Sequence, residues 1–347
     1  MRILVCGAGI AGLASAWWLT RDGHEVVVVE RAPARRRAGY MIDCQGAGYD
    51  TAQRMGLLPQ LWEHAVRLSS LIYHDDDGHV RGQFTEEDSD SGRVVSLMRG
   101  DLERILSEKV DVPIRFAASV ADIHDRGDGV AVTLTDGSIE EVDLLVGADG
   151  VRSRVRTMVF GESDRFVRDL GFHSAAYVCS DADIARKLDD SALHMLDAPG
   201  LQVGAYPLGG DQVATLFTHR VDVGTPLPSD PCAELRRTYG STGWLVPQLL
   251  EHCPEPTSLY YDRVAQIEMS TWSDGHVVLV GDACHAMSLL TGQGAGTALA
   301  GAEILAEQLR HSDSVATASA RYEDRLRPLV EQLQAEGRDS AESFVPR

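Results

Sequence analysis

A glycine-rich turn close to the start of the chain constrains the fold more than any other feature. An apolar run at residues 2–6 ends in Gly7-Ala8-Gly9-Ile10-Ala11-Gly12, and an apolar stretch of helical length, residues 13–20, follows. A second apolar run, residues 26–29, ends at Glu30. The order strand, glycine turn, helix and strand within about 30 residues predicts a βαβ unit of the dinucleotide-binding kind. A glycine-rich turn in another α/β fold is the alternative.

Each residue type in this unit has a physical reason. Gly7 permits the tight turn, Gly9 lets the backbone approach a pyrophosphate, and Gly12 lets the helix pack closely on the strand. The N-terminus of the helix presents free N–H groups to the anion. Glu30 can accept hydrogen bonds from both hydroxyls of an adenosine ribose, and it would repel a 2′-phosphate, so this site disfavours NADP.

The remaining apolar runs predict a second domain. Three Asp-Gly turns, Asp77-Gly78, Asp128-Gly129 and Asp136-Gly137, separate strand-like segments and indicate hairpins. Further strand-like runs at residues 175–179, 201–206 and 213–217, with a helical stretch near 230–250, predict a mostly antiparallel sheet. We expect an α/β nucleotide-binding domain of residues 1–70, 95–165 and 271–347. An α+β substrate domain of residues 71–94 and 166–270 would complete the fold.

Composition excludes several classes of protein. The chain has 32 Lys+Arg and 52 Asp+Glu and a net charge of −20, which argues against binding to nucleic acid or to an anionic membrane. No apolar run approaches the roughly 20 residues of a membrane span, and we expect a cytoplasmic protein. The six cysteines are scattered without a CxxC pair, which predicts neither a disulfide framework nor a zinc site and fits a reducing compartment. We expect the acidic residues at 75–77 and 86–88 to lie in solvated loops, and we expect no metal site.

Two further motifs follow the glycine turn in order. Asp149-Gly150 ends an apolar run, and Gly281-Asp282 precedes the turn Gly292-Gln293-Gly294 and another helix. Together the three motifs resemble the class A flavoprotein monooxygenases, the para-hydroxybenzoate hydroxylase-like family, over essentially the whole chain. The resemblance implies a Rossmann-like FAD-binding domain of the glutathione-reductase type with a mostly antiparallel substrate domain.

The resemblance also implies a set of cofactor contacts. Arg99 would contact the flavin nucleotide, Asp149 would serve FAD and indirectly the nicotinamide, and Asp282 would lie on the ribityl side. The turn at residues 292–296, at the N-terminus of the helix that follows, would lie beside the flavin ring. Its N–H groups can stabilise negative charge on the reduced flavin. The implied residues that bind FAD without a covalent bond are Gly7, Gly9, Ala11, Gly12, Glu30, Arg31, Arg99, Asp149, Gly150, Asp282, Gly292, Gly294, Ala295 and Gly296.

In this family the cofactor carries the difficult chemistry. NADPH or NADH reduces FAD, the reduced flavin captures O₂ as a C4a-hydroperoxide, and one oxygen passes to an electron-rich carbon. The implied substrate is an aromatic or polycyclic small molecule, in secondary metabolism or antibiotic modification. The protein supplies position and dryness. Since the chain has one dinucleotide fingerprint, the nicotinamide cofactor would visit transiently. We expect a monomer or a homodimer.

Candidate substrate and catalytic residues are fewer. His285 is a possible base, although a structural role under the FAD is the favoured interpretation. Asp43 and Gln45 would line the wall beside the flavin by family analogy. In the substrate domain either Tyr206, with Gly204, or Phe217, with Thr215 and His219, faces the flavin, because strands alternate their side chains.

Leu289 is a further candidate substrate residue, and it departs from the family pattern because relatives usually carry proline at this position. A leucine keeps the pocket dry but restores a backbone N–H. This leaves open a flavin-dependent reductase of the geranylgeranyl type, and a flavin-bound scaffold without catalysis is a third hypothesis. A flavin-dependent halogenase is disfavoured, because its WxWxIP segment is absent. NAD(P)H oxidation and O₂ uptake together distinguish the oxygenase from the reductase and the scaffold.

Overall fold

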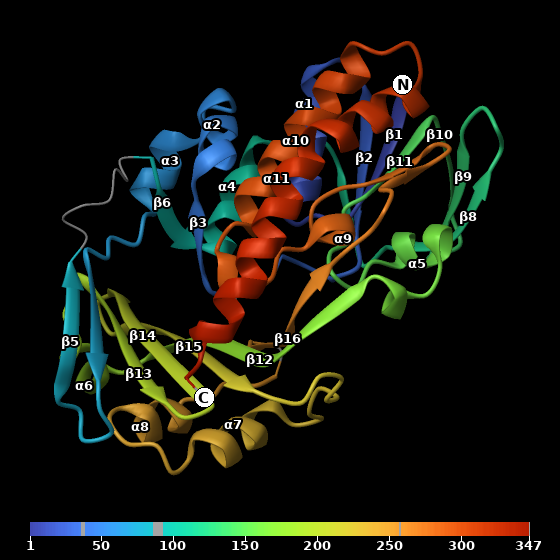
Figure 1. Ribbon diagram of the computed structural model, residues 1–347. Helices are drawn as coiled ribbons and strands as arrows, with labels where there is room; N and C mark the ends of the chain where they lie inside the picture. The colour runs from blue at the N-terminus through green and yellow to red at the C-terminus, as the bar shows by residue number, and fades with distance from the viewer. Residues whose placement is uncertain (36–38, 86–92, 257, 347) are drawn as a thin grey trace.

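The computed structural model describes residues 1–35, 39–85, 93–256 and 258–346. The acidic residues 86–88 therefore lie outside the described residues. Two large sheets organise the chain, one in the upper half of Figure 1 and one in the lower half, and the C-terminal helix passes from the first toward the second.

The first sheet has six strands in the order β17-β18-β11-β1-β2-β7. All neighbouring pairs are parallel except β17 with β18. The strands are β1 (Arg2–Cys6), β2 (Glu25–Glu30), β7 (Ile114–Phe116), β11 (Leu144–Gly147), β17 (Ser273–Asp274) and β18 (Val277–Leu279). Since β1, β11 and β18 are parallel neighbours, their carboxyl ends meet at one edge. The three sequence motifs follow these three strands, and the fold thus brings them together.

Helices cover the first sheet and connect it to smaller sheets. The helices of this part are α1 (Ile10–Arg21), α2 (Gly46–Arg54), α3 (Leu58–Glu63), α4 (Arg99–Lys109), α5 (Arg154–Phe160), α9 (Asp282–His285), α10 (Gly294–Arg310) and α11 (Val315–Phe344), with 3₁₀ turns at Ser163–Arg165 and Leu289–Thr291. The smaller sheets pair β3 (Met41–Cys44) with β6 (Val95–Met98), and join β8 (Val120–Asp125), β9 (Val130–Leu134) and β10 (Ile139–Val142). Within the described residues, no helix is both long enough and apolar enough to cross a membrane.

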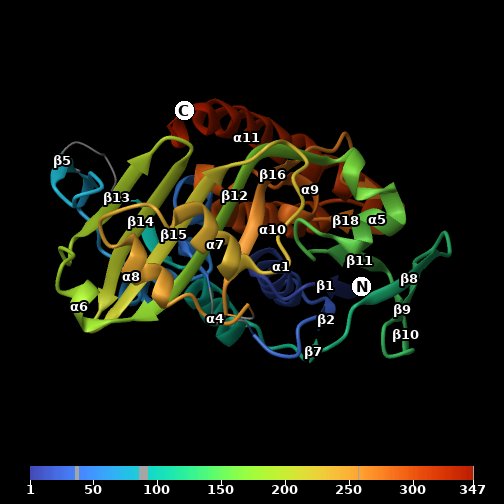
Figure 2. The same ribbon diagram turned by 90° about the horizontal axis from the view of Figure 1, so that it is seen from below.

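The second sheet has seven strands in the order β16-β12-β15-β14-β13-β4-β5. Its pairs are antiparallel except β13 with β4, which confirms the expected mixed α/β fold with a mostly antiparallel second sheet. The strands are β4 (Ser70–His74), β5 (Val80–Thr85), β12 (Val167–Ser180), β13 (Ala192–Ala198), β14 (Leu201–Gly209), β15 (Gln212–Arg220) and β16 (Tyr260–Ile267). Figures 1 and 2 show the helices α6 (Ala182–Ala185), α7 (Pro231–Tyr239) and α8 (Val246–Glu251) on the face turned away from the first sheet.

The cysteines give a correction. Cys232 on α7 and Cys253 after α8 form a disulfide with a Cα–Cα distance of 6.1 Å, whereas the sequence predicts no disulfide framework. The two residues are 21 positions apart, and their proximity depends on how α7 and α8 pack on the sheet. The other cysteines, Cys6, Cys44, Cys179 and Cys284, are free and buried.

Candidate active site

A cleft of ≈ 560 Å³ lies at the edge where the three motifs meet, and it extends to β16 of the second sheet. Most of the residues expected to bind cofactor line it. These are Gly7, Gly9, Ala11, Glu30, Arg31, Arg99, Asp149, Gly150, Asp282, Gly292, Gly294 and Ala295, and Leu289 joins them.

The N-terminus of α1 opens into this cleft. No side chain caps the helix at Gly9, so the N–H groups of its first turn are available to a ligand. A Cβ built on Gly9 would have space, with its nearest neighbours Glu103 Oε1 at 3.8 Å and Arg99 Nη2 at 4.0 Å. Gly7 has φ +112°, and a Cβ there would overlap the carbonyl of Ala148. The site therefore offers bare backbone to an anion such as a pyrophosphate.

Glu30 is oriented by the backbone. Its two carboxylate oxygens accept hydrogen bonds from Ala8 N at 2.9 Å and Ala32 N at 2.8 Å. A carboxylate has about four acceptor sites, so capacity remains for two ligand hydroxyls. This arrangement fits a ribose at the end of β2.

Arg99 and Asp282 place opposite charges across the cleft. Arg99 pairs with Glu103 at 2.7 Å. Burial disfavours its charged form, but Glu103 and Tyr40 outweigh burial, so the pKa of the guanidinium lies above its usual range. Asp282 is open to solvent on the side that faces the cleft, and protein surrounds its other sides. The protein around it raises the pKa of its carboxyl, and the charge of Arg99 opposes this increase. Among the described residues no hydrogen-bond donor reaches the Asp282 carboxylate, which leaves it available to ligand hydroxyls.

Asp149 holds the middle motif in place. Its carboxylate accepts hydrogen bonds from Ser153 Oγ at 2.5 Å, Arg154 N at 2.7 Å and Val155 N at 3.2 Å, at the start of α5. Gly150 follows with φ +77°, a conformation that glycine adopts without strain. The carboxylate thus fixes the turn that lines the cleft.

Arg156 is a buried supporting residue of the site that was not predicted from the sequence. Its fully buried guanidinium donates to Val151 O at 2.6 Å and to Ala283 O at 2.8 Å. These carbonyls lie beside the Asp149-Gly150 and Gly281-Asp282 motifs, so one side chain joins the two. Burial lowers the pKa of Arg156. The signal in the sequence was an arginine close behind an Asp-Gly pair.

One wall of the cleft is aromatic and apolar. Tyr40 and Tyr260 have ring centroids 4.9 Å apart, and Met41, Met287 and Leu289 also line the cleft. Burial raises the pKa of Tyr260 well above its usual value, so its phenol stays neutral. Tyr260 was not predicted from the sequence, because β16 carries no motif and reaches the cleft only through its place at the edge of the second sheet.

Some expected cofactor and catalytic residues lie outside the cleft. A Cβ on Gly12 would overlap Gly7 O and lie 3.3 Å from Ala148 Cβ, so this glycine serves helix packing. A Cβ on Gly296 would lie 3.2 Å from the backbone oxygen of Gln45, so Gly296 serves the close contact between α10 and the start of α2. His285 is buried beside Trp272, and burial lowers its pKa to about 4, which makes it a poor base.

The candidate substrate residues of the second sheet lie on opposite faces of it. Phe217 is fully buried in the core beneath the second sheet, stacked on Tyr177 and in contact with Tyr239, so the expectation that it faces substrate is wrong. Tyr206 lies on the opposite face, and its Oη accepts a hydrogen bond from Met41 N at 3.1 Å. Asp43 accepts a hydrogen bond from Ser96 Oγ at 2.6 Å, and burial raises its pKa. Its Oδ2 would lie 3.2 Å from a Cβ on Gly292, so the carboxylate lies beside the turn that precedes α10.

The donor set fits one cofactor. Bare N–H groups at α1 suit a pyrophosphate, Glu30 suits a ribose, Asp282 suits further hydroxyls, and α10 is a second helix without a side-chain cap that begins at the cleft. Two helix N-termini and a dinucleotide turn beside an antiparallel sheet define a dinucleotide-binding protein and fit FAD.

Comparison with known proteins identifies the family. Residues 1–335 match the model of the FAD binding domain family. An uncharacterized protein, Rv1260, of Mycobacterium tuberculosis is 36% identical over 346 residues, which is 96% of this chain and 91% of the relative. A flavin-dependent monooxygenase of Legionella longbeachae is 32% identical, covering 99% and 90%. The crystal structure of the tetracycline destructase Tet(51) has a TM-score of 0.89 at 31% identity, covering 100% and 91%.

The chain belongs to the FAD binding domain family. It is an FAD-dependent monooxygenase of class A, as its three motifs predict. These relatives give no support to a reductase or to a flavin-bound scaffold.

Proposed function

We propose that this enzyme uses NADPH or NADH and O₂ to hydroxylate a polycyclic aromatic small molecule, in secondary metabolism or antibiotic modification. The observation that carries the proposal is the aromatic and apolar wall formed by Tyr40, Tyr260, Met287 and Leu289 in the cleft that also contains the cofactor motifs. Similarity to a tetracycline destructase supports a fused-ring substrate.

Bound FAD supplies hydride acceptance from the nicotinamide and transfer of one oxygen atom from O₂ to the substrate. The chain's own residues bind and orient. The first turn of α1 and Glu30 would hold the adenosine diphosphate end, and Arg99 and Asp282 would hold the middle of the cofactor. The N-terminus of α10 opens into the same cleft and would favour negative charge on the bound flavin. Met41, Met287 and Leu289 exclude water from the reacting centre.

The cellular setting completes the proposal. We infer that the enzyme works as a monomer or a homodimer in the cytoplasm, where the Cys232–Cys253 pair would be reduced, and that it binds the nicotinamide cofactor only transiently. Its net charge of −20 supports small-molecule chemistry without nucleic acid. We keep the division into an FAD-binding part of residues 1–70, 95–165 and 271–347 and a substrate-binding part of residues 71–94 and 166–270.

The test follows NAD(P)H oxidation and O₂ uptake by the holoenzyme with a panel of substrates that starts with tetracycline and includes simpler phenols. Mass spectrometry identifies the products. The proposal expects substrate to accelerate both processes, and the product to gain one oxygen atom that comes from ¹⁸O₂. Oxidation coupled to loss of an alkene would instead identify a reductase. Bound FAD that none of these compounds causes to turn over would contradict the proposed class of substrate.

A further inference from the structure

The segment after α9 contains a backbone conformation that its residue type disfavours. Ser288 has φ +85° and ψ 154°, a region occupied almost only by glycine. Its hydroxyl is buried and has no hydrogen-bond partner among the described residues. Residues 286–289 line the cofactor cleft, so the strained residue lies within the site. Strain of this kind persists only where the surroundings impose it.

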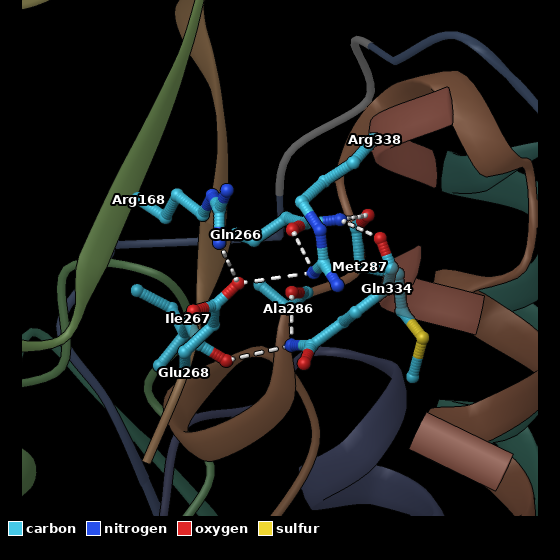
Figure 3. Close-up of polar contacts among 8 residues, drawn as sticks. All are labelled: Arg168, Gln266, Ile267, Glu268, Ala286, Met287, Gln334 and Arg338. Carbon is cyan, nitrogen blue, oxygen red and sulfur yellow. Dashed lines mark hydrogen bonds and ion pairs between the residues drawn. The ribbon is translucent and has the colours of Figure 1, made fainter. Parts of the chain in front are cut away.

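Two buried glutamines hold the backbone just before Ser288 (Figure 3). Gln266 Nε2 donates to Met287 O at 3.0 Å, and Gln334 Nε2 donates to Ala286 O at 3.1 Å. The Met287 carbonyl belongs to the peptide unit that precedes Ser288. Fixing this carbonyl fixes one side of the rotation that defines φ of Ser288.

The glutamines are themselves fixed. Gln266 Nε2 also donates to Gln334 O at 2.8 Å, and Gln334 Nε2 to Ile267 O at 2.8 Å. Arg338 Nη1 donates to Gln266 Oε1 at 3.2 Å and to Glu268 at 3.1 Å. The side chains of Gln266 and Gln334 are 0% and 6% exposed. Buried carboxamides with all these bonds made have little freedom to rotate.

Close packing of α11 supports the same segment. Gly337 lies one turn beyond Gln334, and a Cβ built there would lie 2.6 Å from Thr291 Cγ2 and 3.0 Å from Met287 O. The helix therefore rests directly on the turn that leads to α10. Side chains and backbone of α11 both contact residues 286–291.

We propose that Gln266, Gln334 and Arg338 form a clamp that holds Ser288 in its strained conformation and so preorganises residues 286–292 for the flavin. Gln334 is a positioning residue in this scheme, because it acts through the backbone. Without the clamp, the segment relaxes in the FAD-free protein, and binding must restore the competent conformation. The apparent dissociation constant then rises by the inverse of the competent fraction.

The first experiment measures the FAD dissociation constant of the full-length apoprotein by quenching of flavin fluorescence. Gln334→Ala is expected to weaken binding about tenfold. The matched control is Gln332→Ala on the same helix, where the side chain is exposed and contacts Glu336 at 2.8 Å, and binding should stay unchanged within about twofold. The visible spectrum of the bound flavin should change in Gln334→Ala and not in the control.

A double-mutant cycle separates positioning from mere stability. Ser288→Gly adopts the observed backbone without strain, so Gln334→Ala in this background should weaken FAD binding less than about twofold. Ser288→Ala removes the hydroxyl but keeps the Cβ, so the loss of about tenfold should remain in that background.

Three results would overturn the proposal. One is an equal loss of affinity in the Ser288→Gly and Ser288→Ala backgrounds. Another is a Gln334→Ala protein with a lower melting temperature but an unchanged FAD constant and spectrum. Should Gln334→Ala not fold, Arg338→Met replaces it, because this substitution removes the hydrogen bond from the half-buried Arg338 to Gln266. The proposal then requires Arg338→Met to weaken FAD binding in the Ser288→Ala background and not in the Ser288→Gly background. The third contrary result is an Arg338→Met protein whose FAD affinity changes equally in both backgrounds.

Discussion

At the scale of single residues, two glycines one turn apart have different tasks. Gly9→Ala places a methyl group in the open cleft where a pyrophosphate approaches the backbone. Gly12→Ala forces a Cβ into Gly7 O and close to Ala148 Cβ. We predict that Gly12→Ala lowers the free energy of unfolding by about 1–3 kcal/mol, as overpacking does. We predict that Gly9→Ala changes it by less than about 1 kcal/mol but weakens FAD binding by about tenfold or more.

Urea unfolding of the apoprotein and FAD titration measure the two effects separately. Gly23→Ala is a useful reference, because a Cβ there meets nothing within 4 Å although φ is +83°. It should cost stability through backbone strain and leave FAD affinity unchanged. Similar profiles for Gly9→Ala and Gly12→Ala would contradict the division of tasks.

Asp282 illustrates a residue whose function opposes stability. Burial raises the pKa of its carboxyl, so the folded protein holds an unfavourable charge at neutral pH. Asp282→Asn keeps the size and removes this charge. We predict a higher melting temperature of the apoprotein and a loss of FAD affinity of about tenfold or more, because a charged acceptor is lost. Differential scanning calorimetry and FAD titration check both signs, and a variant with normal FAD affinity would remove Asp282 from the cofactor site.

At the scale of elements, local patterns predicted the strands and turns but not which face of the second sheet is functional. Alternation reveals a strand's face only when one side is polar. Here β14 and β15 have burial on both sides, because α7 and α8 cover one face and the cofactor part covers the other. Tyr206 and Phe217 were therefore indistinguishable in the sequence, and only the packing assigns Phe217 to the core.

The disulfide between Cys232 and Cys253 was also beyond local patterns, because it joins α7 to the chain after α8. Both helices lie on the face of the sheet that is turned away from the first sheet. We predict that reduction, or replacement of both cysteines by serine, lowers the free energy of unfolding by about 3 kcal/mol. FAD affinity and the flavin spectrum should not change. Urea unfolding with and without dithiothreitol measures the loss, and an unchanged midpoint would show that the bridge contributes nothing.

At the scale of the whole molecule, some residues of the cleft could be predicted from the sequence and others could not. The βαβ pattern and two aspartate motifs predicted most of the residues that line the cleft, and the fold brings them together because β1, β11 and β18 are parallel neighbours that end at one edge. Tyr40 and Tyr260 lie far apart in the chain, and they meet because β16, at the edge of the second sheet, reaches the cleft. A residue without a motif, on a strand without a polar face, gives no local signal of its place in a site.

The free energy of unfolding of the whole molecule depends on pH through buried histidine side chains. His173, His194, His219 and His285 are at most 4% exposed, and burial lowers the pKa of each, to about 4 for His219 and His285. In the unfolded chain these groups titrate near 6.5. Between about pH 6.5 and 4, these histidines are therefore protonated in the unfolded chain but neutral in the folded chain. Stability is complete above pH 6.5 and falls as the pH decreases.

We predict that the free energy of unfolding declines by up to about 3 kcal/mol per pH unit within this window from His219 and His285 together, since each missing proton contributes about 1.4 kcal/mol per unit. Urea unfolding of the apoprotein from pH 7.5 to 5 measures the slope. His219→Gln should reduce the slope by the contribution of one proton, whatever its effect on stability at pH 7.5. His124→Gln, at an exposed position, is the control and should leave the slope unchanged. Because burial and not ion pairing causes these shifts, added salt should alter the slope little. A slope that salt abolishes would instead assign the acid sensitivity to surface charge.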